Sequence, residues 1–440
     1  VMTLPMSKLG SITTQHGEGD IGGKAEGLAI IDRMELKEAR KLRTEVFTSD
    51  FYDRYRDNGD ELDGEILDHL RLVLETFPAA PISVRSSEEY ENNPFIPTSG
   101  VSVSYMLPNT HESSDVRFEH LVHAVKHIYD HYALRTQEDE SPGCIAVIVN
   151  PIPGVSGRTK AGEIFFPMSS GVADSFFKHP LTLEQGPQDP REGFARVAFG
   201  HGYAVVRDDF EVIPLATIKR PISPQLMSKD GQRFFYALKL DHDVRFDDRE
   251  MATMANLHMR FAPPEALRYF KGKGNKINFA NLVDENVLGY RDRLAEIMER
   301  IQQHEPHFQI EFTWNVLEEE GVFHVVQFKR LRDLDFTKIA VPKADKRALI
   351  VTDQVQGHGV INGIRYAIVI NPFEYSEELH DEVVAEIGRL DAALKENGER
   401  YVLVCPGRLG TTNRRWGYSI DFESVSNAAA IVEYGYDIKG

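Results

Sequence analysis

The chain has 440 residues, of which 42% are hydrophobic and 27% charged, a composition typical of soluble globular proteins and a length sufficient for two or three domains. Its 68 acidic residues outnumber the 50 basic ones and give a formal charge of -18, which argues against nucleic acid as a partner because such proteins need a basic footprint. No apolar run approaches the roughly 20 residues of a membrane span, and the N-terminus lacks the apolar region of a signal peptide. With only Cys144 and Cys405, far apart in sequence, we expect a cytoplasmic protein with reduced thiols.

Helical and strand-like patterns alternate through the first half of the chain. In chain order they predict a helix over 21–42, a helix over 61–76, strands over 81–84 and 101–107, a helix over 116–135 and a strand over 144–151. The polar residues that follow residue 84 are expected to form a loop, which would contain Arg85, Ser86 and Ser87. Further strands are predicted over 161–167, 195–199 and 204–206, interrupted by a long exposed loop over 178–193.

The second half begins with a predicted helix and hairpin and ends in a smaller unit. The pattern predicts a helix over 283–303, then a hairpin of strands 307–316 and 321–329. Near residues 332–347 charge and proline replace periodicity, which indicates a domain boundary. Beyond it we expect strand 348–352, strand 366–370, helix 376–397, strand 401–404 and a glycine-arginine loop over 406–412. The predicted domains are therefore 1–110, 111–335 and 345–440.

A glycine cluster precedes the first predicted helix. The glycine spacing in 17–22 formally matches the dinucleotide fingerprint, but residues 11–16 would make a poor core strand before it. A P-loop also fails, because Glu18 and Ala25 stand where that motif needs Gly and Ser or Thr. The remaining interpretation is a glycine turn that presents Lys24 at a helix start, where an ammonium and backbone N–H groups suit a phosphate. The alternative is an ordinary turn with a surface lysine.

Two other groups of residues have the chemistry of a phosphate site. Arg85 offers a planar fork for phosphate oxygens, and Ser86 and Ser87 offer hydroxyls; the alternative is a surface loop whose serines cap a neighbour. Glu311 and Gln327 lie on the two strands of the predicted hairpin, where antiparallel pairing can place their oxygens side by side. Such hard oxygens suit Mg2+, whereas a solvent-facing hairpin position is the alternative.

Several histidines are candidate metal ligands or catalysts. Four fall on one face of the predicted helix 116–135, opposite its apolar face: His120, His123, His127 and His131. Pairs at this spacing can chelate a metal, but no Cys or Asp completes the set, so we favour a solvated helix face. His201 and His358 each lie between glycines, where a histidine can accept a phosphoryl group, act as a base or simply form a tight turn.

Together these motifs resemble the N-terminal, ATP-grasp-type nucleotide-binding domain of phosphoenolpyruvate synthase and pyruvate phosphate dikinase. The chain looks still more like a group of bacterial proteins that carry a PEP/pyruvate-binding domain. The matching stretches extend over nearly the whole chain: 21–29, 82–87, 99–109, 166–173, 199–206, 310–312, 325–329, 405–412 and 429–433.

The resemblance implies an α/β or α+β fold, with an ATP-grasp-like domain followed by a small α/β domain, and ATP and Mg2+ as cofactors. It implies the following roles: Lys24, Arg85 and Lys329 as catalytic cations at the ATP phosphates, Ser86, Ser87 and Glu91 as shapers of the nucleotide loop, Gly100 in a lid segment, and Glu311 and Gln327 as Mg2+ ligands. Four features depart from the family pattern. Val103 replaces a glutamate, Lys329 replaces an arginine, the family's Gly-Leu-Gly is Gly-His-Gly at 200–202, and its Glu-Asp pair is Glu91-Asn92.

The leading expectation is a Mg2+- and ATP-dependent phosphotransferase whose acceptor is not identified. No stretch resembles the family's swivelling phosphohistidine domain or its PEP barrel, so His201, His358 or a partner protein are the candidate acceptors. One alternative is a non-catalytic nucleotide-sensing or scaffolding module, motivated by Val103 and Lys329. The other is an ATP-dependent carboxylate ligase, a frequent activity of ATP-grasp folds.

Overall fold

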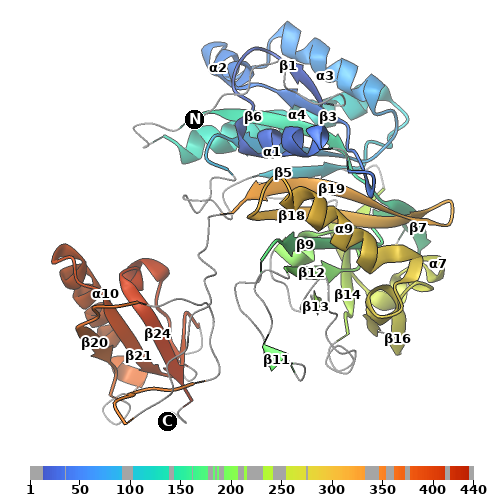
Figure 1. Ribbon diagram of the computed structural model, residues 1–440. Helices are drawn as coiled ribbons and strands as arrows, with labels where there is room; N and C mark the ends of the chain where they lie inside the picture. Colours follow the sequence, from blue (N-terminus) through green and yellow to red (C-terminus); the bar gives the residue numbers. More distant parts are fainter. Residues whose placement is uncertain are drawn as a thin grey trace. The chain divides into compact units, whose positions relative to one another are not determined.

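The computed structural model has mixed α/β architecture with several sheets (Figure 1). Within the part of the chain that it describes, no helix is both long and apolar enough to cross a bilayer. The described residues are 13–34, 36–91, 103–137, 143–160, 162–176, 182–183, 186–187, 193–206, 213–215, 231–240, 254–273, 276–331, 346–352, 361–371, 377–411 and 417–435.

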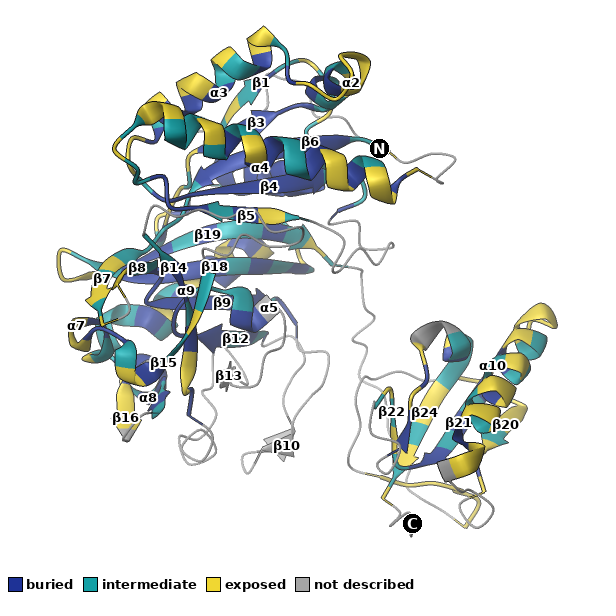
Figure 2. Ribbon diagram, turned by 180° about the vertical axis from the view of Figure 1, so that it is seen from behind, coloured by how far each residue is buried: buried dark blue, intermediate teal, exposed yellow. Residues whose placement is uncertain are grey.

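The first sheet has helices on both faces. Its strand order is β1-β3-β6-β4-β5, with β1 and β3 parallel and the other pairs antiparallel. The strands are β1 Thr13–His16, β3 Thr44–Phe47, β4 Ile82–Glu88, β5 Ser104–Leu107 and β6 Ile145–Pro151. One face packs on α2 Ser49–Asp57, α3 Gly64–Thr76 and α4 Ser114–Arg135 (Figure 2), and the other packs on α1 Gly22–Arg33 (Figure 1).

Local sequence explains the start of α3 and the direction in which the β4 side chains project. Asp63 caps α3, because its Oδ1 accepts the Ile66 N–H at 3.0 Å and satisfies one of the free donors of the first turn. On β4, Ile82 and Val84 join the core beneath α3 and α4. Because successive side chains of a strand project to opposite faces, Arg85 projects toward α1.

The second sheet is the framework of the candidate site. Its order is β13-β12-β9-β18-β19-β2, antiparallel except for β19 and β2. The strands are β2 Ala39–Arg40, β9 Ser169–Asp174, β12 Phe194–Ala198, β13 Ile213–Leu215, β18 Phe308–Leu317 and β19 Glu320–Arg330. One face, with Ile310 and Phe328, packs into a large apolar core with α9 Tyr290–Gln302, and α1 contacts β19.

Smaller elements complete this part of the chain. A four-stranded antiparallel sheet has the order β15-β14-β8-β7, and two short hairpins lie beside it in sequence. Their strands are β7 Val155–Thr159, β8 Gly162–Phe166, β14 Phe234–Lys239, β15 Met254–His258, β10 Thr182–Leu183, β11 Gly186–Pro187, β16 Lys271–Lys273 and β17 Lys276–Asn278. The short helices are α5 Tyr203–Val206, α7 Pro264–Leu267, α8 Ala280–Val283, η3 Met259–Phe261 and η4 Val287–Gly289.

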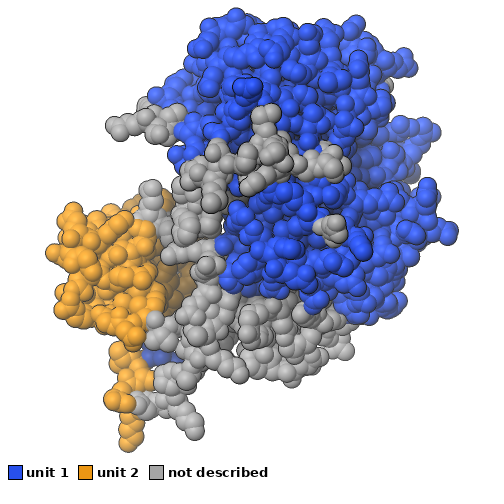
Figure 3. All heavy atoms as spheres, turned by 45° about the horizontal axis from the view of Figure 1, so that its top comes forward, with its two compact units in different colours: residues 1–336, 350–357 blue, residues 337–349, 358–440 orange. Residues whose placement is uncertain are grey.

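Contacts between Cα atoms divide the chain into two compact units, Val1–Phe336 with Ile350–Gly357, and Thr337–Leu349 with His358–Gly440 (Figure 3). The second unit contains a parallel sheet of order β20-β21-β24, whose face packs on α10. Its elements are β20 Tyr366–Val369, η5 Glu377–Leu379, α10 His380–Glu396, β21 Tyr401–Pro406, β22 Arg408–Leu409, β23 Gly417–Tyr418, η6 Phe422–Val425 and β24 Ala428–Tyr434.

Two predicted helices are shorter in the structure. The helix predicted over 21–42 ends at Arg33, where the next residue is extended. The helix predicted over 283–303 begins at Tyr290. The turn before it has positive φ at three residues, which no helix tolerates: Asn286, Leu288 and Gly289.

Two predicted strands were wrong. Residues 204–206 form α5, and a short apolar run cannot be told from a buried helical turn by periodicity alone. Residues 348–352 form no strand, and Leu349 is 98% exposed, because none of the described strands pairs with them. The loop predicted over 178–193 and the boundary over 332–347 lie largely outside the described residues.

Candidate functional site

Arg85 lies in the middle of β4 and not in a loop after it. β4 continues to Glu88, and the Arg85 side chain is almost completely buried, with 7% of the residue exposed. The predicted loop over 85–87 was therefore wrong. The arginine is supported by a strand, which restricts its motion more than a loop would.

One nitrogen of the Arg85 guanidinium joins the two large sheets. Nη2 donates to Asn150 Oδ1 on β6 at 3.1 Å and to Val326 O on β19 at 3.0 Å. The register of β18 and β19 shifts between Glu311 and Phe312 and leaves Val326 without an opposite residue on β18. The β-bulge leaves the Val326 carbonyl outside the ladder of the two strands, and Arg85 Nη2 donates to this carbonyl.

Two buried polar atoms near this junction have no hydrogen-bond partner among the described residues. They are Arg85 Nε on β4 and Thr313 Oγ1 on β18, and Thr313 is 6% exposed. Leaving a buried donor unpaired costs on the order of 1–3 kcal/mol, so native structures rarely retain one without a reason. A bound ligand is one such reason.

Lys24 lies in the first turn of α1, beside the end of β4. Its Nζ donates to Glu91 Oε1 at 2.8 Å and to Ser86 O at 3.1 Å. Glu91 Oε2 accepts the Glu88 N–H at 3.0 Å, and both Lys24 and Glu91 are buried. The ammonium therefore already has a carboxylate partner, and an anionic ligand must share it or displace it.

The two serine hydroxyls bond to the main chain. Ser86 Oγ accepts the Val103 N–H at 3.1 Å. Ser87 Oγ donates to Ile21 O at 2.8 Å and accepts the Ala25 N–H at 3.1 Å. Ser87 therefore fixes the start of α1 against β4, whereas Ser86 fixes the chain just before β5.

Two glycines permit this close approach of α1. Gly22 has a φ of +68°, and a Cβ on it would lie 2.0 Å from Ser87 O. A Cβ on Gly23 would lie 1.6 Å from Glu91 O. No larger residue fits at either position, so the glycine pair is what brings Lys24 to its partner.

Glu311 and Gln327 share the polar face of the six-stranded sheet. The register aligns one row across four strands, formed by Arg196, Val172, Glu311 and Gln327. Residues directly opposite one another on antiparallel strands project to the same face, so the carboxylate and the amide are neighbours, as the hairpin pattern predicted. The adjacent Ile310 faces the core.

A second polar row lies two residues further along the strands. It is formed by Phe194, Asp174, Gln309 and Lys329. Gln309 Nε2 donates to Asp174 Oδ1 at 2.7 Å. Lys329 therefore projects from the face that carries Gln327, as an arginine would at the same position.

Charges from both sheets act on one another at this junction. Burial raises the pKa of the Glu311 carboxyl above its ordinary value, whereas the charges of Arg85, Lys24 and Lys329 lower it. Burial lowers the pKa of Arg85, whereas the carboxylates of Glu311 and Glu91 raise it. These residues, from α1, β4, β18 and β19, therefore lie within electrostatic range of one another.

The oxygens of Glu311 and Gln327 suit a magnesium ion. Mg2+ retains several waters and commonly takes only one or two protein carboxylates together with substrate phosphates. No group of three His, Cys, Asp or Glu residues gathers as a metal site in the described ranges. The raised pKa of Glu311 fits a cation, because a nearby positive charge would favour the ionised form.

The remaining predicted positions divide into three outcomes. His201 lies between β12 and α5, near enough to Arg85 for the arginine to lower its pKa. In the histidine stripe of α4, His123 and His131 are exposed, as a solvated face predicts, whereas His120 and His127 are half-buried and His127 contacts the Tyr105 ring. Gly100 and His358 lie outside the described residues.

The sequence reasoning missed three residues. Asn150 ends a strand of otherwise apolar residues, and this single amide in a core strand was the available signal. Its Nδ2 donates to Arg43 O at 3.0 Å, which holds Oδ1 toward Arg85. The bulge at Val326 and the unpaired hydroxyl of Thr313 have no sequence signal.

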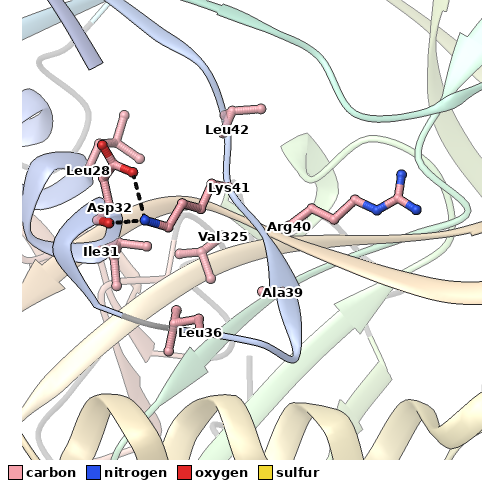
Figure 4. Close-up of a pocket in the computed structure, with 9 residues that line it drawn as sticks. All are labelled: Leu28, Ile31, Asp32, Leu36, Ala39, Arg40, Lys41, Leu42 and Val325. Carbon is pink, nitrogen blue, oxygen red and sulfur yellow. Dashed lines mark hydrogen bonds and ion pairs between the residues drawn. The ribbon is translucent and has the colours of Figure 1, made fainter. Parts of the chain in front are cut away.

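A separate small cavity lies between α1, β2 and β19 (Figure 4). Its volume of about 20 Å³ has room for a single water and not for a nucleotide. Lys41 Nζ pairs with Asp32 Oδ1 at 3.2 Å at its edge. It is lined by Leu28, Ile31, Asp32, Leu36, Ala39, Arg40, Lys41, Leu42 and Val325, none of which is a predicted site residue.

Comparison with protein-family models and with curated protein sequences gives no match for this chain. The resemblance to the phosphoenolpyruvate synthase and pyruvate phosphate dikinase domain therefore depends on the short motifs themselves. What the structure contributes is the placement of Lys24, Arg85, Glu91, Glu311, Gln327 and Lys329 around one junction between two sheets.

Proposed function

We propose that this protein binds Mg2+–ATP at the junction of Lys24, Arg85, Glu311, Gln327 and Lys329 and transfers the terminal phosphoryl group. The observation that carries the proposal is the buried, unpaired Arg85 Nε beside the Glu311 carboxylate. A triphosphate supplies the anionic acceptors that such a donor lacks, through charge-assisted hydrogen bonds. An ATP-grasp-like arrangement of the two sheets and the family resemblance are parts of the same proposal.

Each residue has a separate task in this proposal. Arg85 is fixed by Asn150 and by Val326 O, so it can donate to a phosphate oxygen without first becoming ordered. Lys24 and Lys329 add positive charge around the transferred group. When bound between Glu311 and Gln327, Mg2+ would neutralise charge on the phosphates.

The transfer itself needs positioning more than covalent chemistry. An acceptor oxygen or nitrogen attacks the γ-phosphorus, the bond to the bridging oxygen breaks, and ADP leaves with that bond's electron pair. The cluster supplies charge complementary to the departing ADP.

A second function, nucleotide sensing without transfer, is favoured by one observation. The Lys24 ammonium is already satisfied by Glu91 Oε1 and Ser86 O, which gives the ligand-free state a stable arrangement of its own. Val103 also stands where the resembled family has an acidic residue. A sensor would use the exchange of Glu91 for a phosphate as its signal.

Binding and turnover experiments separate these functions. We expect Lys24→Ala to weaken Mg2+–ATP binding by about tenfold or more, because a charge-assisted bond is lost. The matched control is Lys126→Ala, since Lys126 forms a surface ion pair with Glu61 on the outer side of the first sheet. A Lys24→Ala protein that binds ATP as tightly as the parent would exclude the assigned site.

Labelled ATP then distinguishes the reaction classes. Transfer of γ-label to a protein or small molecule supports the phosphotransferase. ADP release that depends on an added carboxylate supports the ligase, and tight binding without turnover supports the sensor.

A further inference from the structure

His201 lies on the Glu311 face of the six-stranded sheet. It follows β12 and precedes α5, and Ala204 and Val205 of α5 pack on Val172. Val172 is directly opposite Glu311 in the register of β9 and β18. α5 therefore covers the same face of the sheet that presents the Glu311 carboxylate.

The main chain around His201 is held on both sides. Its N–H donates to Tyr236 O at 2.8 Å, and Ser170 Oγ donates to Gly200 O at 2.8 Å. Gly200 has a φ of +88°, and a Cβ on it would lie 2.7 Å from Tyr236 O. A glycine is thus required before His201, and the imidazole starts from a fixed backbone position.

The hydrogen bonds assign the tautomer of His201. Its Nδ1 accepts the Tyr203 N–H at 3.3 Å, so Nδ1 holds a lone pair. Burial and the positive charge of Arg85 lower the pKa of His201 to about 4, so the ring is neutral at neutral pH. A neutral imidazole with an unprotonated Nδ1 carries its proton on Nε2.

We propose that His201 binds a phosphoryl oxygen of the ligand as a neutral hydrogen-bond donor through Nε2, and that it is not the phosphoryl acceptor. The identity of the ligand rests on the proposed function. Nucleophilic attack from Nε2 would need a lone pair there, and the bond to Tyr203 assigns a proton to that atom. A neutral donor also avoids placing a second cation beside buried Arg85.

Nuclear magnetic resonance of ¹⁵N-labelled histidine tests the state of the ring directly. We expect Nε2 of the ligand-free protein to carry the proton, and the His201 signals to stay constant between about pH 5.5 and pH 8. Addition of tripolyphosphate, or of Mg2+–ATP, should shift the Nε2–H signal. A ring that titrates near neutral pH, or that neither anion perturbs, overturns the proposal.

Substitution tests the donor in binding. His201→Gln keeps an N–H near the Nε2 position and should change the Kd for Mg2+–ATP by no more than about threefold, whereas His201→Leu should weaken it about tenfold. The matched control is His258→Leu, because Arg260 N–H donates to His258 Nδ1 at 3.2 Å in the same local geometry, on the edge strand β15. That substitution should leave the Kd unchanged.

The outcomes separate this inference from the proposed function. Acid-labile phosphate that appears on the wild type and disappears in His201→Gln identifies His201 as the acceptor and overturns the inference. If tripolyphosphate shifts the ring but ATP does not bind, the inference stands and the proposed function fails. If ATP binds and is turned over with the ring signals unmoved, the function stands and the inference fails. Should His201→Leu not fold, the wild-type spectra decide.

Discussion

Arg85 in the first unit keeps a buried donor without a hydrogen-bond partner, whereas buried Asp391 in the second unit is bonded within the fold. In the second unit, Asp391 on α10 accepts the Tyr401 hydroxyl at 2.7 Å and the Asn427 N–H at 3.0 Å. In the first, Arg85 is buried to a similar degree and keeps Nε unpaired. Burial of a polar residue therefore does not by itself identify a functional position, and the state of its bonds does.

Two histidines, buried His380 in the second unit and half-buried His201 in the first, show the same contrast. In the second unit both ring nitrogens of His380 have partners, Ser419 N–H at Nε2 and Asp381 Oδ1 at Nδ1, each at 3.1 Å. His201 uses Nδ1 alone within the loop that carries it. We read the first arrangement as structural and the second as available to a ligand.

The largest expected effect is on stability in the second unit. Asp391→Ala leaves the Tyr401 hydroxyl and the Asn427 N–H buried without an acceptor, and should lower the free energy of unfolding by about 3 kcal/mol. Asp391→Asn retains an acceptor oxygen and should lower it less. Chemical denaturation measures both variants. A weaker affinity for ATP with unchanged stability would break the comparison between the units.

Arg85→Ala should affect the affinity for ATP more than the stability, the reverse of Asp391→Ala. Loss of the fixed guanidinium is expected to raise the Kd for Mg2+–ATP about 100-fold, because a charge-assisted donor is lost. Stability should fall less than in Asp391→Ala, because removal of the unpaired Nε partly offsets the loss of the bonds to Asn150 Oδ1 and Val326 O. Titration calorimetry gives the Kd. Arg85→Lys, which keeps the charge without the fork, should give an intermediate value, and an unchanged Kd in both variants would remove Arg85 from the site.

Glu311→Gln should separate metal binding from stability. Burial raises the pKa of Glu311, so between the ordinary value of about 4.3 and the raised pKa the folded state holds a proton that the unfolded chain has lost. The stability of the wild type therefore falls, relative to that of Glu311→Gln, as the pH rises through this range. Without Mg2+ the variant should therefore be the more stable at pH 7. It should also need about tenfold more Mg2+ for ATP binding. Unfolding curves across pH and Mg2+ titrations test the two parts, and equal Mg2+ requirements would exclude Glu311 as a ligand.

The smallest expected effect is at Ser87. Ser87→Ala removes the acceptor of the Ala25 N–H at the start of α1 and should cost about 1 kcal/mol, as the loss of a helix cap does. ATP affinity should fall only slightly, since the serine acts through the position of α1. Ser104→Ala on the exposed side of β5 is the control. A loss of affinity as large as in Arg85→Ala would mean that Ser87 contacts the ligand.

The sequence was sufficient where local pattern decides the structure. Alternation predicted the hairpin over 307–316 and 321–329, and the strands are Phe308–Leu317 and Glu320–Arg330. The exact pairing of Glu311 with Gln327 also depends on the bulge, because the register that runs from the turn to Phe312 and Val325 would place Val326 opposite Glu311. The strand at Arg85 could not be predicted, because its partners Asn150 and Val326 are 65 and 241 residues away.

Long-range contacts also explain the other failures. Whether residues 204–206 form a strand or a helix depends on their packing with Val172, which no local pattern contains. The paired state of Lys24 depends on Glu91, brought near by the fit of Gly22 and Gly23 against the chain. Residue type identified the chemistry of the site, and tertiary contacts determined which atoms remain available.

Because of the bulge at Val326, the Arg85 side chain both joins the two sheets and offers an unpaired donor to a ligand. The carbonyl that Val326 turns out of the ladder holds Arg85, so the bond that joins the two sheets ends on the same guanidinium whose Nε is unpaired. If the proposed ligand binds at Nε, we expect it to immobilise this guanidinium without breaking the bond from Nη2, which would link ligand binding to the rigidity of the contact between the sheets. Amide hydrogens of β19 near Gln327 should then exchange more slowly in the presence of ligand, so that their exchange rate would report the fraction of protein that has bound ligand.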